Sequence, residues 1–249
     1  MNNSEFSSLN LSSALQDNLA SLGYLQMTPI QAQSLPLVLD GKDLIAKAKT
    51  GSGKTAAFGL GLLAKLDVNR LAVQALVLCP TRELADQVAT EIRRLARTLP
   101  NVKLVTLCGG TPTAPQSATL GFGAHIAVGT PGRILKHLEQ GTLELDDLKT
   151  LVLDEADRML DMGFGEDINR VISHAPRDRQ TLLFSATYPE GIAQMSRGVQ
   201  RNPVEVSVES LHEESAIEQK LYEVPAGGGG GGGAPRGGPA PPAPRGGGG

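Results

Sequence analysis

The chain has 249 residues, 40% of them hydrophobic and 20% charged, and a net charge of −3 at pH 7. This length allows one sizeable core or two small ones, and the slightly acidic balance means that any binding to nucleic acid must come from local basic groups and backbone donors. No apolar run is long enough to span a bilayer and the N-terminus lacks the pattern of a signal peptide, so the sequence predicts a soluble, cytoplasmic protein without a membrane partner. The two cysteines, Cys79 and Cys108, each end an apolar run and are predicted to be buried free thiols.

The N-terminal part of the chain has a helical pattern. Residues 9–39 alternate apolar and polar positions at helical spacing, with one break at Gly23-Tyr24 and another at Thr28-Pro29. Thr28 fits a helix N-cap and Pro29 the first helical position, and this placement fixes the direction of Gln31. A glutamine amide both donates and accepts hydrogen bonds, as the edge of a purine requires. An ordinary glutamine on a helix surface is the alternative.

A glycine-rich loop follows at residues 48–55, with the sequence Ala-Lys-Thr-Gly-Ser-Gly-Lys-Thr. It lies between a short apolar run and a helical stretch, which is the context of a phosphate-binding loop. The strict pattern begins with Gly, and Ala48 is a small variant that leaves room for the loop. Gly51 and Gly53 allow a tight turn that directs N–H groups inward, Lys54 reaches the β- and γ-phosphates, and the hydroxyl of Thr55 ligates Mg²⁺. A glycine-rich turn with a chance Lys-Thr is the alternative.

Apolar runs of four to six residues then alternate with helical stretches. The predicted strands are 75–78, 102–107, 125–128, 150–153, 181–184 and 204–208. The predicted helices are 83–99, 113–120, 131–139 and 189–199, with more than one helix near 155–174. This alternation predicts an α/β fold, a parallel sheet with helices on both faces. In such sheets the chemistry lies at the carboxyl ends of the strands, where each of the following motifs falls.

Three strand ends carry residues suited to phosphate groups. They are Thr81-Arg82, Gly109-Gly110 and Thr130-Pro131-Gly132-Arg133. Helix N-termini with Thr and Arg bind phosphates, and three in a row would follow a nucleic-acid backbone without reading bases. Well-capped turns between strand and helix are the alternative for any single one.

Two further strand ends carry acids and hydroxyls. Asp154 follows a core strand, where a carboxylate can hold the Mg²⁺ of a triphosphate, and Glu155 is placed to orient and deprotonate a water molecule. Helix capping is the alternative for both. Ser185 and Thr187 close the next strand and can hydrogen-bond the acids and relay the nucleotide state, or simply cap the helix after Pro189. The four histidines show no metal-ligand spacing.

Taken in order, these motifs resemble those of the first RecA-like domain of the DEAD-box RNA helicases over residues 6–222. The resemblance implies a doubly wound RecA-like sheet, ATP and Mg²⁺ as cofactors, and RNA as the partner. The residues it implies for ATP binding are Phe6, Tyr24, Gln31, Ala48, Lys49, Thr50, Gly51, Ser52, Gly53, Lys54 and Thr55, with Gln31 reading adenine in a pocket shaped by Phe6 and Tyr24.

The resemblance also assigns the remaining roles. Lys54, Asp154 and Glu155 would serve catalysis, with Thr55 and Asp154 at the metal. The RNA backbone would be held by Thr81, Arg82, Gly110, Thr130 and Arg133, while Ser185 and Thr187 would couple ATP state to RNA strain. Residues 56–63 and 75–80 are most similar to a bacterial member that acts on large-subunit ribosomal RNA, which implies a role in ribosome biogenesis.

The predicted organisation has four parts. Residues 1–39 are an N-terminal helical segment with the Q motif, packed on a RecA-like helicase ATP-binding domain at 40–210; an interdomain linker starts at 211–224, and a Gly/Pro-rich tail at 225–249 is expected to be disordered. We hypothesise that the tail is DNA read out of frame after a truncation, and a natural RNA-touching tail is the alternative.

The second RecA-like domain of the family, whose arginine completes the ATP site, does not follow in this sequence. Such an arginine contributes roughly 10³- to 10⁵-fold to turnover, so this chain alone is expected to hydrolyse ATP near background and to unwind nothing. The predicted function is the ATP-binding half of an ATP-dependent RNA helicase. The alternative is a non-catalytic RNA- or nucleotide-binding fragment.

Overall fold

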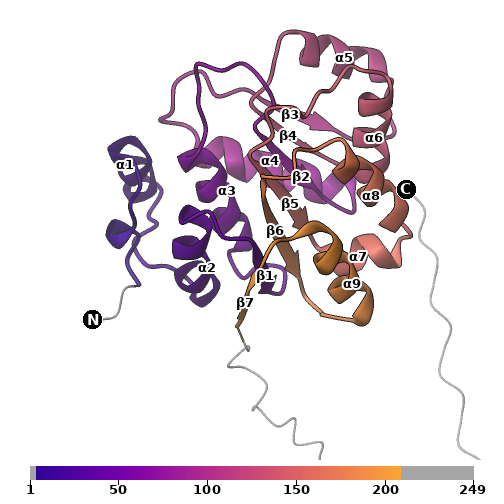
Figure 1. Cartoon of the computed structure of the whole chain (residues 1–249). Coiled ribbons are helices and arrows are strands. Elements are labelled where there is room, and N and C mark those ends of the chain that lie inside the picture. Colours follow the sequence, from indigo (N-terminus) through magenta and orange to yellow (C-terminus); the bar gives the residue numbers. More distant parts are fainter. Residues whose placement is uncertain (1–3, 209–249) are drawn as a thin grey trace, which may run out of the picture. The chain divides into compact units, whose positions relative to one another are not determined.

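Seven parallel strands form the centre of the protein within residues 4–208, the part that the computed structural model describes (Figure 1). The strands are β1 (Leu44–Lys47), β2 (Ala75–Leu78), β3 (Leu104–Leu107), β4 (Ile126–Gly129), β5 (Thr150–Asp154), β6 (Gln180–Ser185) and β7 (Val204–Ser207). They lie in the order β3-β4-β2-β5-β6-β1-β7, with every pair of neighbours parallel. The predicted parallel α/β sheet is therefore confirmed. The predicted linker and tail at 211–249 lie outside the described residues.

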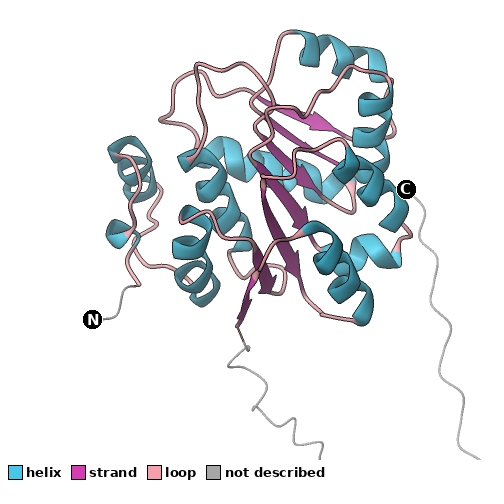
Figure 2. Ribbon diagram, in the orientation of Figure 1, coloured by secondary structure: helices cyan, strands magenta, loops and turns pink. Residues whose placement is uncertain are grey.

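Helices cover both faces of this sheet (Figure 2). They are a short 3₁₀ turn η1 (Phe6–Ser8), α1 (Ser13–Ser21), α2 (Pro29–Leu39), α3 (Lys54–Ala64), α4 (Arg82–Leu95), α5 (Thr113–Gly121), α6 (Pro131–Glu139), α7 (Ala156–Asp161), α8 (Gly165–Ser173) and α9 (Glu190–Val199). The first four α-helices pack on one face, and α6 to α9 pack on the other. Within residues 4–208 no helix has the length and apolar character needed to cross a membrane.

The strands from β1 to β6 supply side chains to two separate cores. In β2, Val77 belongs to the core under α3 and α4, whereas Leu76 and Leu78 belong to the core on the opposite face. This alternation follows from the two-residue period of a strand, and burial on both faces explains why the strands appear as uninterrupted apolar runs. On the first face, the ring of Phe58 in α3 lies 5.3 Å from the ring of Phe184 in β6. This contact holds the helix after the glycine loop firmly on the sheet.

One predicted helix differs from the structure in length. The helix predicted at 83–99 ends at Leu95, where the side-chain amide of Asn18 donates to the carbonyls of Arg94 and Leu95 and satisfies the end of the helix. No proline marks this end. The helices predicted near 155–174 are α7 and α8, which are separated where Gly163 takes a left-handed conformation with φ of 82°.

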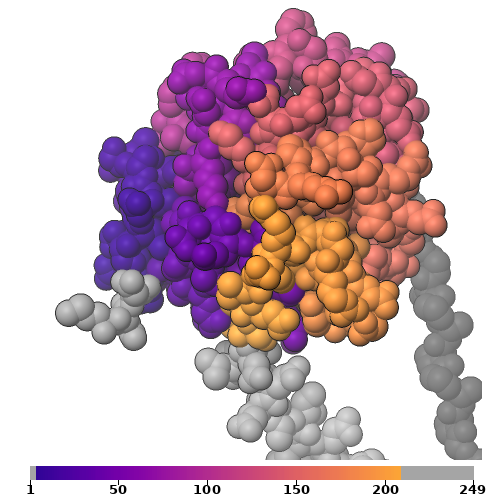
Figure 3. Space-filling view, in the orientation of Figure 1, coloured from indigo at the N-terminus to yellow at the C-terminus, as the bar shows by residue number. Residues whose placement is uncertain are grey.

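The N-terminal segment lies against α3 and α4. Asn18 reaches the end of α4, Thr98 Oγ1 donates to the carbonyl of Ala14, and Arg97 donates to Ser21 Oγ. In Figure 3 the indigo atoms of this segment lie beside the violet atoms of the following helices. α2 approaches α3 closely at Gly61, which has no side chain. A Cβ at this position would lie only 2.2 Å from Cγ1 of Val38. The close approach places the start of α2 beside the glycine loop.

Candidate functional site

The glycine loop connects β1 to α3 at the carboxyl edge of the sheet. The N–H of Ala48 donates to the carbonyl of Ser185 on the neighbouring strand, and Lys54 is the first residue of α3. Gly51 and Gly53 have φ of 83° and 91°, in the left-handed region that favours glycine. A Cβ at Gly53 would also lie 2.6 Å from Nε2 of Gln31, so any other residue there meets both backbone strain and a clash.

The start of α2 is hydrogen-bonded to this loop. Thr28 Oγ1 donates to the carbonyl of Ser52, and Gln31 Nε2 donates to the carbonyl of Gly53 at 3.0 Å. Gln31 Oε1 in turn accepts from the N–H of Thr28 at 2.8 Å. An amide has two donor hydrogens and two acceptor lone pairs, so each end of Gln31 keeps one position for a further partner. The side chain is 3% exposed and lies beside the loop rather than on an open surface.

The two aromatic residues that are predicted to shape the adenine pocket come before Gln31 in the N-terminal segment. Phe6 is 1% exposed, and its ring lies 5.9 Å from the ring of Tyr24. The Tyr24 hydroxyl donates to Glu91 Oε1, and burial followed by this bond raises the pKa of Tyr24. Neither ring lines the cavity that holds Lys54. The structure therefore brings Gln31 to the glycine loop but leaves Phe6 and Tyr24 in a cluster with α4.

A cavity of 460 Å³ lies at the carboxyl edge of the sheet. Lys54 is 4% exposed, and its Nζ lies 2.7 Å from Oδ1 of Asp154 and 3.6 Å from Oε1 of Glu155. The loops after four different strands contribute to the lining, which includes Ala48, Thr50, Lys54, Thr81, Glu155, Asp157 and Ala186. The glycine loop follows β1 and the two acids lie at the end of β5. Because β6 lies between β1 and β5, only the end of β6 separates the loop from the acids.

Asp154 is fully buried. Its Oδ1 is paired with the ammonium of Lys54, whereas its Oδ2 has no hydrogen-bond partner among the described residues. Burial raises the pKa of Asp154, and the ammonium of Lys54 opposes the rise. Residues 4–208 hold no group of three or more His, Cys, Asp or Glu side chains that could bind a metal by itself. The Asp154 carboxylate therefore fits a Mg²⁺ ion whose other ligands are phosphate oxygens and water, with half-buried Thr55 as the next residue after Lys54.

Glu155 has a left-handed backbone with φ of 53°, an arrangement that costs a non-glycine residue about 1 to 3 kcal/mol. Its carboxylate accepts from Thr50 Oγ1 at 2.8 Å and lies 3.4 Å from Nη1 of Arg158. Burial acts to raise the pKa of Glu155, but Thr50, Lys54 and Arg158 together bring it below the usual value. An ionised carboxylate that lines the cavity is able to accept a proton from a water molecule.

Asp157 joins the acidic strand end to the hydroxyls after β6. Its Oδ2 accepts from both the N–H and the Oγ1 of Thr187, at 2.9 and 2.8 Å, and its N–H donates to Ser185 Oγ. Burial opposes ionisation of Asp157, whereas the bonds from Thr187 outweigh it and lower the pKa. The order of the strand ends predicted that the hydroxyls lie near the acids, but it did not single out Asp157 as their partner.

The strand ends of β2, β3 and β4 form a second group beside the cavity. Thr81 caps α4 by accepting from the N–H of Leu84. The exposed side chain of Arg82 lies beside Gly110, because a Cβ added to this glycine would be 3.7 Å from Nη1 of Arg82. The N–H of Thr130 donates to the carbonyl of Leu107. The predicted RNA-contacting residues therefore come from neighbouring strand ends of one edge.

Arg133 is fixed by a network that the sequence did not predict. Its Nη1 donates to Gln116 Oε1 and its Nη2 to the carbonyl of Thr111, both at 2.8 Å. Gln116 also donates to the carbonyl of Cys108 and lies 2.9 Å from Nε2 of fully buried His137, whose pKa is lowered by burial and then by Arg133. Arg133 and His137 are four residues apart on α6, which was the available signal that they share a face.

A glycine loop that opens a helix, a lysine held by a strand-end aspartate and an all-parallel sheet define a RecA-like P-loop domain. Residues 28–195 match the DEAD/DEAH box helicase family. The chain belongs to this family, which confirms the resemblance found in the sequence.

Several relatives are named as RNA helicases. The chain is 60% identical over 219 residues to the ATP-dependent RNA helicase DbpA of Escherichia coli (strain K12). The aligned region covers 88% of the chain and 48% of that protein. It is 47% identical over 207 residues to the ATP-dependent RNA helicase DeaD of Buchnera aphidicola subsp. Schizaphis graminum, covering 83% of the chain and 34% of that protein. The chain thus spans half or less of the length of these relatives.

The fold also matches a solved structure. A DEAD box protein from the hyperthermophile Methanococcus jannaschii superposes with a TM-score of 0.80 and 39% sequence identity. The match covers 83% of this chain and 56% of that chain. The likeness confirms the predicted RecA-like fold.

Proposed function

We propose that this chain is the ATP-binding half of an ATP-dependent RNA helicase. The observation that supports the proposal most is the grouping of Lys54, Asp154 and Glu155 in one cavity at the end of the glycine loop. The names of the relatives place RNA and ATP among the ligands of the family's full-length members.

In the proposed mechanism, ATP phosphates lie on the loop N–H groups and at the N-terminus of α3. Lys54 would exchange its contact with Asp154 for the phosphate oxygens, and Asp154 and Thr55 would be the residues that hold Mg²⁺. When bound, the metal supplies positive charge that stabilises the charge developing on the phosphates. Glu155, kept ionised by its neighbours, orients a water molecule and accepts its proton.

The nucleotide contacts are completed by the start of α2. Gln31 has free hydrogen-bonding positions for the adenine edge, while Lys49, Thr50 and Ser52 complete the loop around the phosphates. The aromatic pair of Phe6 and Tyr24 would shape the adenine pocket from the N-terminal segment, as the resemblance implies.

RNA would lie along the strand ends of β2, β3 and β4. Thr81, Arg82, Gly110, Thr130 and Arg133 offer backbone N–H groups, hydroxyls and guanidinium groups to the sugar-phosphate backbone. The bonds of Asp157 to Ser185 and Thr187 would carry the change at the nucleotide to this edge.

Turnover at the rate of a full helicase requires a second RecA-like domain, because an arginine from a partner domain contributes roughly 10³- to 10⁵-fold in phosphate-loop enzymes. Large-subunit ribosomal RNA is the proposed substrate and ribosome assembly the proposed process, on the strength of the similarity to DbpA. Since the chain spans 48% of that relative, a non-catalytic RNA- or nucleotide-binding role of this chain alone is the second candidate.

ATPase assays with and without RNA, and with the second RecA-like domain of a full-length relative added as a separate chain, test the proposal. We expect hydrolysis near background for the chain alone and RNA-stimulated hydrolysis when the domain is added. Glu155→Gln should abolish the stimulated rate, whereas Lys136→Ala, an exposed lysine of α6, should leave it unchanged. Failure of the added domain to raise the rate would favour the non-catalytic role.

A further inference from the structure

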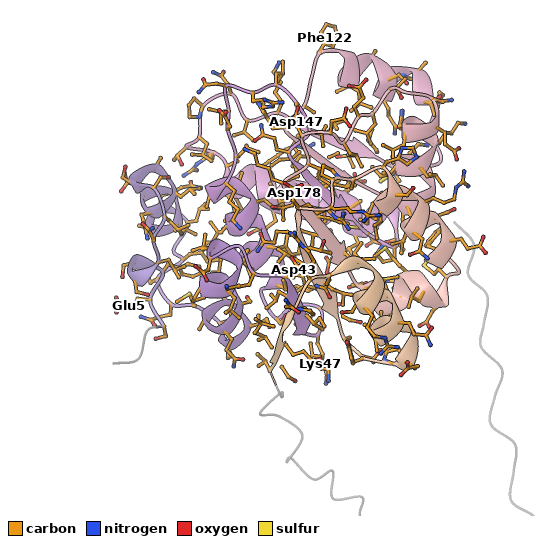
Figure 4. The ribbon with its side chains drawn as sticks, viewed as in Figure 1. Glu5, Asp43, Lys47, Phe122, Asp147 and Asp178 are labelled. Carbon is orange, nitrogen blue, oxygen red and sulfur yellow. The ribbon has the colours of Figure 1, made fainter. Side chains whose placement is uncertain are left out.

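A second cavity, of 540 Å³, lies at the edge of the sheet opposite the nucleotide site. Residues just before β6 and β7 line it, and since the strands are parallel these amino ends face away from the glycine loop. Asp178, labelled in Figure 4, lies in the chain between two of the arginines concerned. The lining includes Ser173, Arg177, Arg179, Gly198 and Arg201.

The three arginines form no ion pair within the described part of the chain. Other arginines there are paired, such as Arg158 with Glu155 and Arg197 with Glu190. The nearby carboxylate of Asp43, also labelled in Figure 4, accepts the backbone N–H groups of Thr181 and Arg201 at 2.8 and 2.7 Å. Asp43 keeps its negative charge, which acts on Arg179, so one carboxylate faces three guanidinium groups and the cavity keeps an excess of positive charge.

Arg179 is the deepest of the three, at 7% exposure. Its Nη1 and Nη2 donate to the carbonyls of Pro176 and Val199, but its Nε has no partner among residues 4–208. A buried, charged N–H without an acceptor is unfavourable. Nε is itself shielded from solvent, so a ligand oxygen in the cavity would satisfy it after a shift of the Arg179 side chain. Burial lowers the pKa of Arg179, Asp43 opposes the fall, and the neighbouring charge of Arg201 adds to it.

Helix ends account for only part of this positive charge. α8 ends at Ser173 and α9 at Val199, and the C-terminus of a helix carries roughly half a negative charge. Two such ends and the Asp43 carboxylate together offset about two of the three guanidinium charges. The remaining charge and the free Nε of Arg179 are unexplained by the packing of the protein alone.

We propose that this cavity binds a small anion of the phosphate class. Guanidinium groups match the oxygens of phosphate in both charge and geometry, and the volume is within the range of small-molecule sites, about 300 to 1,000 Å³. An RNA backbone on the surface would meet the exposed Arg177 and Arg201, whereas only a ligand that enters the recess reaches Arg179. The inference does not depend on the proposed function.

The test is a titration of the full chain, labelled with ¹⁵N, with inorganic pyrophosphate, followed by the amide signals in NMR spectra. The amides of Gly198 and Arg201 report on this cavity, and those of Gly51 and Gly53 report separately on the glycine loop. We expect saturable shifts of the first pair. Arg177→Gln with Arg201→Gln should raise the pyrophosphate concentration needed for half-maximal shifts tenfold or more. The matched pair Arg93→Gln with Arg97→Gln, exposed on α4 and just after it, should leave that concentration unchanged.

Arg177→Gln alone gives a second test. The side chain of Arg177 is exposed, so this single variant should fold like the parent chain, and it should weaken pyrophosphate binding severalfold. Shifts confined to the glycine loop, or equal titrations of the arginine variants and the parent chain, would overturn the proposal. Sulfate producing the same shifts at the same concentration would reduce the site to an adventitious ion only. A short RNA that shifts the cavity amides when pyrophosphate does not would also overturn it, in favour of a nucleic-acid contact.

Discussion

Replacing Lys54 by alanine should destabilise the protein in a way that depends on pH. Lys54 and Asp154 are 4% and 0% exposed, and their charged atoms lie 2.7 Å apart. Removing one member of a buried ion pair typically costs about 3 to 5 kcal/mol, because the other charge remains buried without a partner. The cost here should be near the lower value, because Asp154 already has a raised pKa and can take up a proton instead.

The sign of the pH dependence follows from the carboxyl group. Lys54 is what opposes the rise of the Asp154 pKa, so in Lys54→Ala the pKa of the folded state lies higher still above the unfolded value of 3.8. Between those two values the folded state binds more protons than the unfolded state, so stability falls as pH rises, by up to about 1.4 kcal/mol per pH unit. Lys54→Ala should therefore lose more stability, relative to the parent chain, at pH 8 than at pH 5.

Urea denaturation of the parent chain and the variant at both pH values measures this difference. Asp154→Asn added to Lys54→Ala removes the buried charge, so the double variant should be more stable than Lys54→Ala alone at pH 8. Lys136→Ala is the matched control on an exposed face. The same loss at both pH values, or a double variant no more stable than Lys54→Ala, would refute the reasoning.

Three other variants probe the rest of the site. Gly53→Ala should lower the free energy of unfolding by about 1 to 3 kcal/mol, because the new Cβ meets Gln31 and the backbone is left-handed; an unchanged urea midpoint would argue against the loop geometry. Gln116→Ala should weaken RNA binding about tenfold in fluorescence anisotropy by releasing Arg133, as one to two charge-assisted bonds are lost, and adding Arg133→Ala should cause little further loss. Asp157→Ala should leave ATP binding intact but remove RNA stimulation of hydrolysis in the presence of the second domain, and full stimulation would exclude the coupling role.

Much of the fold was predictable because buried strands and their helices leave strong local patterns. Apolar runs located six strands of the described residues, alternation of valine with polar residues located β7, and proline and threonine located the starts of α2 and α6. The glycine loop was predictable as well, since its spacing is imposed by the phosphates that such loops bind. The end of α4 was not, because it depends on Asn18, a residue 77 positions away from Leu95.

The parts of the site that escaped prediction depend on contacts between distant segments. Gln116 binds Arg133 and His137 only because α5 and α6 follow neighbouring strands, and no local pattern reveals that arrangement. The same holds for the cavity of Arg177, Arg179 and Arg201, which is formed where two turns meet. Sequence patterns give the residues at a strand end, whereas the hydrogen bonds between strand ends require the fold.

The most direct test of the account is the binding of ATP to this chain, measured by isothermal titration calorimetry with and without Mg²⁺. The account predicts weak binding that Mg²⁺ strengthens, a loss of tenfold or more in Lys54→Ala, loss of the Mg²⁺ effect in Asp154→Asn, and no change in Lys136→Ala. Equal affinity of all four proteins for ATP, or an affinity indifferent to Mg²⁺ in the parent chain, would contradict it.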